Sequence, residues 1–254
     1  MKLLLLILFF FCRAQSAESQ LAEQIVSIFE NGTPVIQYNY VARLEDWKKR
    51  GLTFGRAGFT SCQDGVEVLQ ELKKINPKNA LITFLSEMQK AAEGSVSCEI
   101  SVNKLITQKF DKSFSELADL PEVKLAQDRV FQRRYYEPAQ RLTKKYRLKN
   151  YWSFVVILDS YIQHGEGDQG EGIEAILKKL KRTKPRTAKQ EFKWLNGFLD
   201  QRFKILSHGD DEWKHSVGRV NVLRDLLRQY FKKTPDIVKF RSSEYGNFDL
   251  NEAK

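Results

Sequence analysis

Apolar residues recur at helical spacing through most of this 254-residue sequence, and this periodicity limits the folds open to it. Leu21, Ile25 and Phe29 fall on one face of a first helix, which should end near Glu30. The helical pattern resumes after Gly65 and continues toward the C-terminus. It predicts further helices over residues 65–72, 79–92, 122–146, 151–163, 171–180, 188–206 and 211–231. The sequence therefore predicts a mainly α-helical protein.

One stretch departs from this periodicity. Residues 31–34 (Asn-Gly-Thr-Pro) have strong turn chemistry, and residues 35–60 are rich in Val, Ile, Tyr, Thr and Gly. We expect short strands there, forming one small β-hairpin region, and an irregular tail after about residue 231. Within the long helix over 122–146, Pro138 should kink or interrupt the helix because proline lacks a backbone N–H.

The N-terminus has the three parts of a secretory signal peptide: Lys2, an apolar run over residues 3–12, and small residues over 14–17. The apolar run is too short for a membrane-spanning helix, which needs about 20 residues. We therefore expect residues 1–17 to be removed and the mature chain to be secreted, either outside the cell or into the periplasm. We expect no stable insertion into a membrane.

The chain carries a formal net charge of +10, and much of the excess lies in the basic run 178–186. Such a run can bind nucleic acid or an anionic cell envelope, but it is more often a solvated helix end followed by a loop. No aromatic residues are interleaved with it for stacking on bases, so we expect no nucleic-acid partner.

The cysteines and the absence of metal-binding or phosphate-binding motifs limit the chemistry open to this chain. The mature chain keeps Cys62 and Cys98, which could form a disulfide or remain two buried thiols. No Cys–His spacing suggests a zinc site, and no glycine-rich loop suggests a bound phosphate. We therefore expect neither a metal nor an organic cofactor.

Two carboxylates are candidates for acid–base chemistry. Glu30 ends the first helix, and Asp46 follows about one hairpin later. Hydrolysis of a glycosidic bond needs one protonated carboxyl to protonate the leaving oxygen and one ionised carboxylate to activate water. The spacing alone is weak evidence, but the motifs around it are more specific.

Ordered motifs run over most of the mature chain: Glu30-Asn31, Gln37-Tyr38-Asn39-Tyr40, Arg50-Gly51-Leu52-Thr53 with Gly58-Phe59, Val130-Phe131-Gln132, Tyr136-Glu137-Pro138-Ala139, Asp159 with His164-Gly165, residues 195–200 (Leu-Asn-Gly-Phe-Leu-Asp) with Arg202, and Arg219-Val220. In these motifs the chain resembles the family-46 chitosanases.

The resemblance implies a two-lobed, lysozyme-like fold with the β-hairpin region lining the cleft. Residues 18–254 would then form a single catalytic domain whose lobes are joined by the helix over about 122–146, and which we expect to be a monomer.

The resemblance also implies an activity and its catalytic residues. The family cleaves chitosan internally, with inversion at the anomeric carbon. Glu30 matches the general acid, and Thr53 matches the threonine that holds the attacking water. Asp46 matches the catalytic base when counted forward from Tyr38. Counting back from Arg50 reaches Lys48 instead, because Trp47-Lys48-Lys49 stands where the family usually has one glycine. Asp46 is therefore the preferred base, with Glu45 as the fallback.

Further residues are assigned by the same resemblance. Arg202, Asp159 and Arg219 match a buried charge relay that supports the general acid, and Arg50 matches the arginine next to the base. Three residues are expected to bind the polysaccharide substrate: Asp64, which would pair with a glucosamine ammonium group, together with Tyr38 and His164.

Two alternatives stay open. A basic enzyme is poorly matched to chitosan, which is a polycation, and better matched to glucosamine within an anionic wall. The second reading is therefore a lysozyme-like hydrolase of deacetylated peptidoglycan. A third is an inactive homologue that only binds sugar polymer, because of the altered segment Trp47–Lys49.

Overall fold

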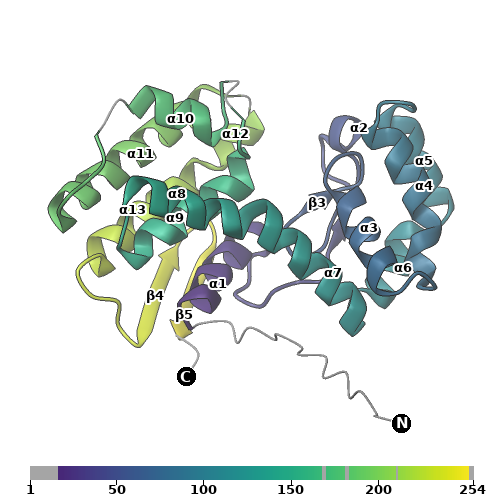
Figure 1. Cartoon of the computed structure of the whole chain (residues 1–254), viewed down its shortest axis with the longest axis horizontal. Coiled ribbons are helices and arrows are strands. Elements are labelled where there is room, and N and C mark those ends of the chain that lie inside the picture. Colours follow the sequence, from purple (N-terminus) through teal and green to yellow (C-terminus); the bar gives the residue numbers. More distant parts are fainter. Residues whose placement is uncertain (1–16, 168–169, 181–182, 210, 252–254) are drawn as a thin grey trace, which may run out of the picture.

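The computed structural model describes residues 17–167, 170–180, 183–209 and 211–251, and it has a smaller and a larger lobe connected by one long helix (Figure 1). The predicted signal peptide, except Ala17, lies outside the described residues. None of the helices within the described residues is both long enough and apolar enough to span a membrane.

The smaller lobe combines a small antiparallel sheet with short helices. Its strands pair in the order β1-β2-β3, with Val41 opposite Phe54 and Phe54 opposite Phe59. Its elements are β1 (Val41–Ala42), α2 (Trp47–Arg50), β2 (Thr53–Phe54), β3 (Phe59–Thr60), α3 (Gly65–Ile75), η1 (Ala80–Phe84), α4 (Leu85–Ala92), α5 (Cys98–Thr107) and α6 (Phe110–Leu117). Phe54 packs edge-on against Phe110 and Phe114, with ring centroids 5.3 and 4.8 Å apart, so the sheet is anchored to α6.

The disulfide that the sequence left open is present. Cys62, just after β3, is bonded to Cys98 at the start of α5. The bond closes a loop across 36 sequence positions and fixes the β-hairpin region to the helices of the smaller lobe.

The long helix runs from α7 (Pro121–Phe131) through the π-helical turn η2 (Gln132–Tyr136) into α8 (Glu137–Tyr146). The predicted interruption is therefore confirmed as a local widening of the helix rather than a break. Pro138 lies in the first turn after η2, where its missing N–H is tolerated. The widened turn contains Arg134 and Tyr135, which both line the groove between the lobes.

The larger lobe contains the N-terminal helix and the C-terminal half of the chain. Its elements are α1 (Ala17–Asn31), α9 (Tyr151–His164), α10 (Ile173–Leu180), α11 (Ala188–His208), α12 (Asp211–His215), α13 (Val217–Tyr230), β4 (Ile237–Ser242) and β5 (Gly246–Asn251). The single helix predicted over 211–231 is divided in two. The Ser216 N–H bonds to the Trp213 carbonyl at 3.0 Å, three residues back, which tightens the last turn of α12.

The prediction of an irregular tail after residue 231 is wrong. Strands β4 and β5 form a regular antiparallel hairpin with Val238 opposite Leu250 and Phe240 opposite Phe248. Side chains of β4 alternate between buried and exposed positions, because Val238 and Phe240 point into the lobe. The Phe240 ring packs on Phe29 at 5.6 Å, so this hairpin supports the end of α1.

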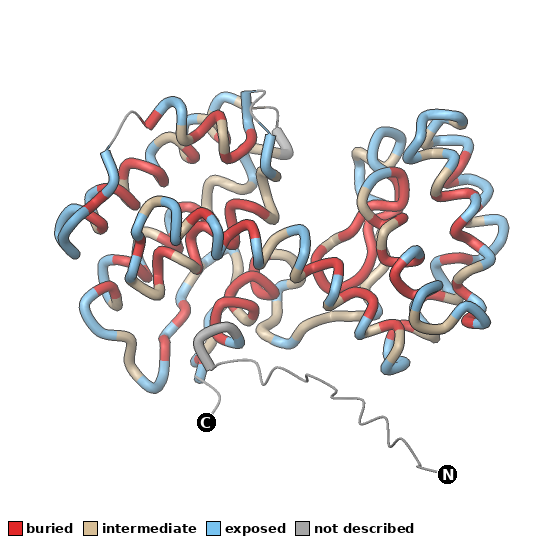
Figure 2. Tube along the Cα trace, in the orientation of Figure 1, coloured by how far each residue is buried: buried red, intermediate tan, exposed pale blue. Residues whose placement is uncertain are grey.

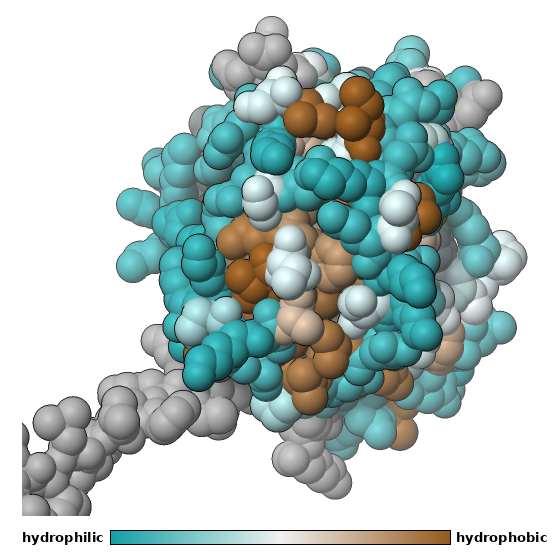
Figure 3. Space-filling model, turned by 90° about the vertical axis from the view of Figure 1, so that its right-hand side faces the viewer, coloured by the Kyte–Doolittle hydropathy of each residue, from teal (hydrophilic) through white to brown (hydrophobic). Residues whose placement is uncertain are grey.

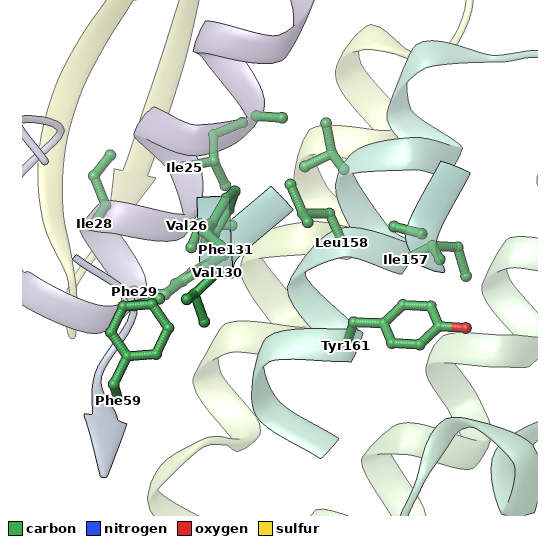
Figure 4. Packing of buried hydrophobic residues seen from close by; sticks show 14 of the residues in the cluster. Ile25, Val26, Ile28, Phe29, Phe59, Val130, Phe131, Ile157, Leu158 and Tyr161 are labelled. Carbon is green, nitrogen blue, oxygen red and sulfur yellow. The ribbon is translucent and has the colours of Figure 1, made fainter. Parts of the chain in front are cut away.

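Buried side chains form the interior of both lobes and continue along the connecting helix (Figure 2). The prediction that residues 151–163 form a deeply buried helix is confirmed, since nine residues of α9 are buried. Figure 4 shows the junction, where Val26 of α1, Phe131 of α7 and Leu158 of α9 lie close together. On the outer end of the smaller lobe, hydrophilic side chains surround an apolar area (Figure 3).

Candidate active site

An open groove of about 760 Å³ is lined by residues of both lobes. Carboxylates line it from both sides: Glu30 from α1 of the larger lobe, and Asp46 and Asp64 from the smaller lobe. Glu171, from the loop after α9, also lines it. The groove therefore gathers acidic side chains from four separate segments, although the chain as a whole is strongly basic.

Glu30 lies in the last turn of α1, with its side chain 22% exposed. One carboxylate oxygen is 2.8 Å from Nη1 of Arg219. The neighbouring Phe29 is buried, and its ring packs against Tyr245 at 5.1 Å and under the Arg219 guanidinium at 4.9 Å. The carboxyl group is therefore held at the groove by an apolar support and one charged partner.

Arg219 belongs to a buried chain of charges that the sequence correctly grouped. Its Nη2 and Nε are each 2.6 Å from Oδ1 of Asp159, and Nη2 of Arg202 is 2.6 Å from the other Asp159 oxygen. Asp159 and Arg202 are fully buried, and their order is Glu30–Arg219–Asp159–Arg202. Because Asp159 lies between two arginines, it shares its charge with both and fixes the direction in which Arg219 meets Glu30.

Asp46 lies directly before α2, a single helical turn formed by the unusual segment Trp47-Lys48-Lys49 and Arg50. Its carboxylate pairs with Nη1 of Arg50 at 3.0 Å and lines the groove. The fallback residue Glu45 is exposed and is not among the groove residues. Arg50 therefore holds Asp46 and does not join the chain behind Glu30.

The additional helical turn is fixed to the smaller lobe by its own contacts. Lys48 pairs with Glu99 of α5 at 3.0 Å, and the Arg43 guanidinium lies 3.5 Å from the centroid of the Trp47 ring. Only Lys49 of the two lysines lines the groove.

Thr53 is buried in β2 opposite Thr60 and is not itself a groove residue. Gly58 lies between Thr53 and Glu30: a Cβ atom built on it would be 3.5 Å from Thr53 Cγ2 and 3.6 Å from Glu30 Oε2. The φ angle of Gly58 is +64°, which disfavours residues with a side chain. Glycine at this position therefore keeps the space between Glu30 and Thr53 open.

Asp64 is held in the groove by three donors. Its Oδ1 accepts bonds from the Thr60 N–H at 2.8 Å and the Thr60 hydroxyl at 3.2 Å, and its Oδ2 accepts from the Tyr135 hydroxyl at 2.7 Å. Burial and the Asp64 charge raise the pKa of Tyr135 well above its usual value, so its hydroxyl stays a donor. Asp64 therefore presents a fixed negative charge to a ligand in the groove.

His164 lines the groove at the end of α9. Its Nε2 accepts a bond from Nε of Arg202 at 3.0 Å, so Nδ1 carries the proton and donates to the Glu171 carbonyl at 2.9 Å. Burial and the Arg202 charge hold the pKa of His164 well below its usual value. This neutral imidazole therefore connects the groove to the buried charge chain.

Tyr38 lies elsewhere, contrary to the expectation that it binds substrate. Its hydroxyl donates to Asp128 of α7 at 2.8 Å, and it is not among the groove residues. Asp128 also pairs with the buried Arg56, whose other partner is Glu23 of α1. Tyr38 therefore belongs to a second charge cluster, centred on the buried Arg56, which ties the turn between β2 and β3 to α1 and α7.

The sequence analysis did not single out two residues that lie near Glu30 or line the groove. Tyr40 lies close enough to Glu30 that burial and the Glu30 charge raise the pKa of its hydroxyl. Trp213 of α12 lines the groove and packs on the His164 ring at 5.2 Å. Tyr40 falls inside a quoted motif, whereas no sequence signal marks Trp213, because α12 meets α9 only through the tertiary fold.

Glycoside hydrolases use a pair of carboxylates that face each other across a groove. Here the two carboxylates come from opposite lobes, and buried arginines lie behind one of them.

Comparison with known proteins specifies the class further. The profile of Glycosyl hydrolase family 46 matches residues 24–235. A chitosanase of Bacillus subtilis (strain 168) is 39% identical over 236 residues, and the match covers 89% of this chain and 83% of that protein.

Solved structures agree with the sequence comparison. The native chitosanase of Bacillus subtilis MY002 superposes with a TM-score of 0.81 at 38% identity, covering 92% of this chain and 98% of that one. A family-46 chitosanase of Gynuella sunshinyii, solved in complex with chitotetraose, gives a TM-score of 0.79 at 35% identity over 93% of this chain and 98% of that one. The chain belongs to glycosyl hydrolase family 46, and it is a glycoside hydrolase.

Proposed function

We propose that this protein is a secreted endo-chitosanase that hydrolyses β-1,4 bonds next to glucosamine with inversion. The observation that carries the proposal is the placement of Glu30 and Asp46 in one groove, each beside its own arginine. The likeness to chitosanases over nine-tenths of the chain, one of them in complex with chitotetraose, supports the substrate class.

In the proposed reaction, protonated Glu30 gives its proton to the glycosidic oxygen as the C1–O bond breaks. A water molecule loses a proton to Asp46 and attacks C1 from the opposite face, which inverts the anomeric centre. Arg219 stabilises the negative charge that forms on Glu30 when it has lost its proton. Thr53 orients the attacking water, and the space left by Gly58 supports this role.

Carboxylates recognise the substrate in this proposal. Asp64 and Glu171 in the groove attract ammonium groups of glucosamine, which offsets the repulsion between a basic enzyme and a polycation. His164 is proposed to orient the groove wall through Arg202 and to contact the sugar from beside Trp213.

One observation favours a second substrate. Lys49 lines the groove, and no ion pair of Lys49 occurs among the residues that the structure describes. A free ammonium group there suits a carboxylate on the substrate, such as the lactyl-peptide branch of deacetylated peptidoglycan.

The decisive experiment measures reducing-end release by residues 18–254 from chitosan, chitin, native peptidoglycan and chemically deacetylated peptidoglycan. Glu30→Gln and Asp46→Asn should each abolish release, and Glu45→Gln should not. Proton NMR of the first products should show the α-anomer. If reducing ends are released from deacetylated peptidoglycan alone, that polymer and not chitosan is the substrate. Binding of chitosan without any release would support the inactive homologue instead.

Secretion is part of the proposal. The predicted signal peptide and the Cys62–Cys98 disulfide both suit an oxidising compartment outside the cytoplasm. Mass spectrometry of the chain recovered from the culture medium or periplasm should find a mature N-terminus near Glu18. An intact N-terminus retained in the cell would contradict export.

A further inference from the structure

A second cavity, of about 370 Å³, lies at the other end of α9 from the groove. Asn150, which precedes α9, lines this cavity, whereas His164 at the end of α9 lines the groove. With a rise of 1.5 Å per residue, the helix separates the two sites by about 20 Å. The cavity is therefore distinct from the candidate active site.

Three cationic side chains line this cavity. Arg147 and Lys149 come from the loop before α9, and Arg186 comes from the basic run that precedes α11. All three are exposed, and none takes part in an ion pair within the described part of the chain. The sequence interpretation of this run as a solvated helix end and loop is therefore incomplete, because Arg186 forms a wall of a defined cavity.

Glu191 is the acidic residue that lines the cavity, and it already has donors. Its Oε1 accepts bonds from the backbone N–H groups of Lys149 and Asn150, both at 2.8 Å, and from the Ser153 hydroxyl at 2.6 Å. This carboxylate thus fixes the loop that presents Arg147 and Lys149. Three cations and one carboxylate leave an excess of two positive charges at the cavity.

Two helices begin at the same cavity. Asn150 caps α9 by accepting from the Trp152 N–H at 3.0 Å, and Thr187 caps α11 by accepting from the Gln190 N–H at 3.2 Å. Both capping residues line the cavity, so the positive ends of a 14-residue and a 21-residue helix add to its field.

A third segment increases the positive charge at this corner. The Asn150 side-chain amide donates to the Phe231 carbonyl at 2.7 Å, and the exposed Lys232 and Lys233 follow directly in the chain. Cations from three segments thus gather on one side of the larger lobe.

We propose that this cavity binds a phosphate group, either free or carried by an anionic polymer. Free phosphate or a phosphate monoester carries about −1.5 to −2 charges at neutral pH, which matches the excess of two positive charges better than one carboxylate does. Two guanidinium groups offer paired donors to phosphate oxygens. The site has a role apart from hydrolysis, because it repels the polycation proposed as substrate.

The test is calorimetric titration of residues 18–254 in a phosphate-free buffer at constant ionic strength. The probes are inorganic phosphate, linear polyphosphate and polygalacturonate. The variant Arg147→Gln/Arg186→Gln removes two cations from the cavity. The matched control Lys73→Gln/Lys78→Gln removes two exposed cations from the smaller lobe, so both variants lose the same charge. Thermal melting checks that both remain folded.

We expect the cavity variant to bind phosphate or polyphosphate at least tenfold more weakly than wild type, with the control unchanged. Binding of inorganic phosphate would identify a free anion as a sufficient ligand, and binding of polyphosphate alone would identify a polymer. Three results would overturn the proposal: no binding by wild type, equal weakening in both variants, or polygalacturonate bound as tightly as polyphosphate.

Discussion

The guanidinium of Arg219 lies 2.8 Å from the carboxylate of Glu30 and connects it to the buried interior of the larger lobe. Behind it, Asp159 accepts a hydrogen bond from Arg219 and forms an ion pair with Arg202, so four charges alternate in sign from the groove to the core. Such a chain sets the orientation of Glu30 as well as its electrostatic surroundings.

Arg219→Met should therefore lower kcat by about 10²–10³-fold, as loss of one preorganised hydrogen-bond donor does in other active sites. The KM for glucosamine oligomers should change much less, because Arg219 is proposed to act through Glu30 and is not among the groove residues. The control is Arg224→Met on the same helix, whose partner is the exposed Asp200. Near-normal kcat in Arg219→Met would contradict a supporting role.

The lowered pKa of His164 predicts that the stability of the protein depends on pH. Its pKa is held well below its usual value in the folded chain, so the unfolded chain binds the proton more readily. The contribution of His164 to the free energy of unfolding should therefore be fully present above pH ~6.5. The free energy of unfolding should decrease as the pH falls below that value, by at most about 1.4 kcal/mol per pH unit.

Urea unfolding between pH 5 and 8 measures this effect. His164→Gln should remove part of the slope, and His208→Gln, at an exposed position, should leave it unchanged. Identical slopes for wild type and His164→Gln would refute the assignment.

The second charge cluster predicts a large loss of stability. Arg56 is buried between Glu23 and Asp128, so Arg56→Met would remove the buried guanidinium that pairs with both carboxylates. We expect a cost of about 3–5 kcal/mol in the free energy of unfolding. Arg133→Met, which removes an exposed partner of Glu67, should cost less than about 1 kcal/mol. Similar costs for both variants would show that burial of the cluster is unimportant.

The disulfide should stabilise the smaller lobe. Replacing both cysteines with serine releases a loop that spans 36 sequence positions, and the chain-entropy estimate for that loop is about 4 kcal/mol. Because Cys62 lines the groove, activity should fall at a lower temperature in the variant than in wild type. Equal melting temperatures for the oxidised wild type and the double variant would contradict this expectation.

The C-terminal hairpin should matter for the groove, although it lies outside it. Phe240→Ala should cost about 3–5 kcal/mol, because its ring is fully buried against Phe29. Phe248→Ala on the paired strand is the matched control and should cost less, since Phe248 is only partly buried. Chemical denaturation with an activity assay would reveal whether loss of the Phe29 support also affects Glu30.

Local patterns were sufficient for most of the fold. The apolar period located α1, α9 and α11, and the turn residues after Glu30 correctly separated α1 from the small sheet. The pattern failed after residue 231, where short alternation over β4 was not recognised as a strand. A hairpin of this kind gains its stability from packing against α1, which is more than 200 positions away in the sequence.

The candidate site was predicted from the sequence only through its motifs. These identified Glu30, Asp46, Asp64 and the Arg219–Asp159–Arg202 chain, all of which the fold positions at or behind one groove. Tyr38 was grouped with the substrate residues because it lies in a motif, but its hydroxyl bonds to Asp128 instead. A motif records which residue types occur together in the chain, and it does not record which way a side chain points.

The sequence by itself determined the helical class, the family resemblance and the residues able to carry acid–base chemistry. Only the tertiary structure decided that Asp46 rather than Glu45 enters the groove, that Trp213 covers His164, and that Arg147 and Arg186 meet around a second cavity. The physical reason is that helix periodicity and turn chemistry act over a few neighbouring residues. Contacts between distant segments depend instead on how complete helices pack, and local propensity does not encode that arrangement.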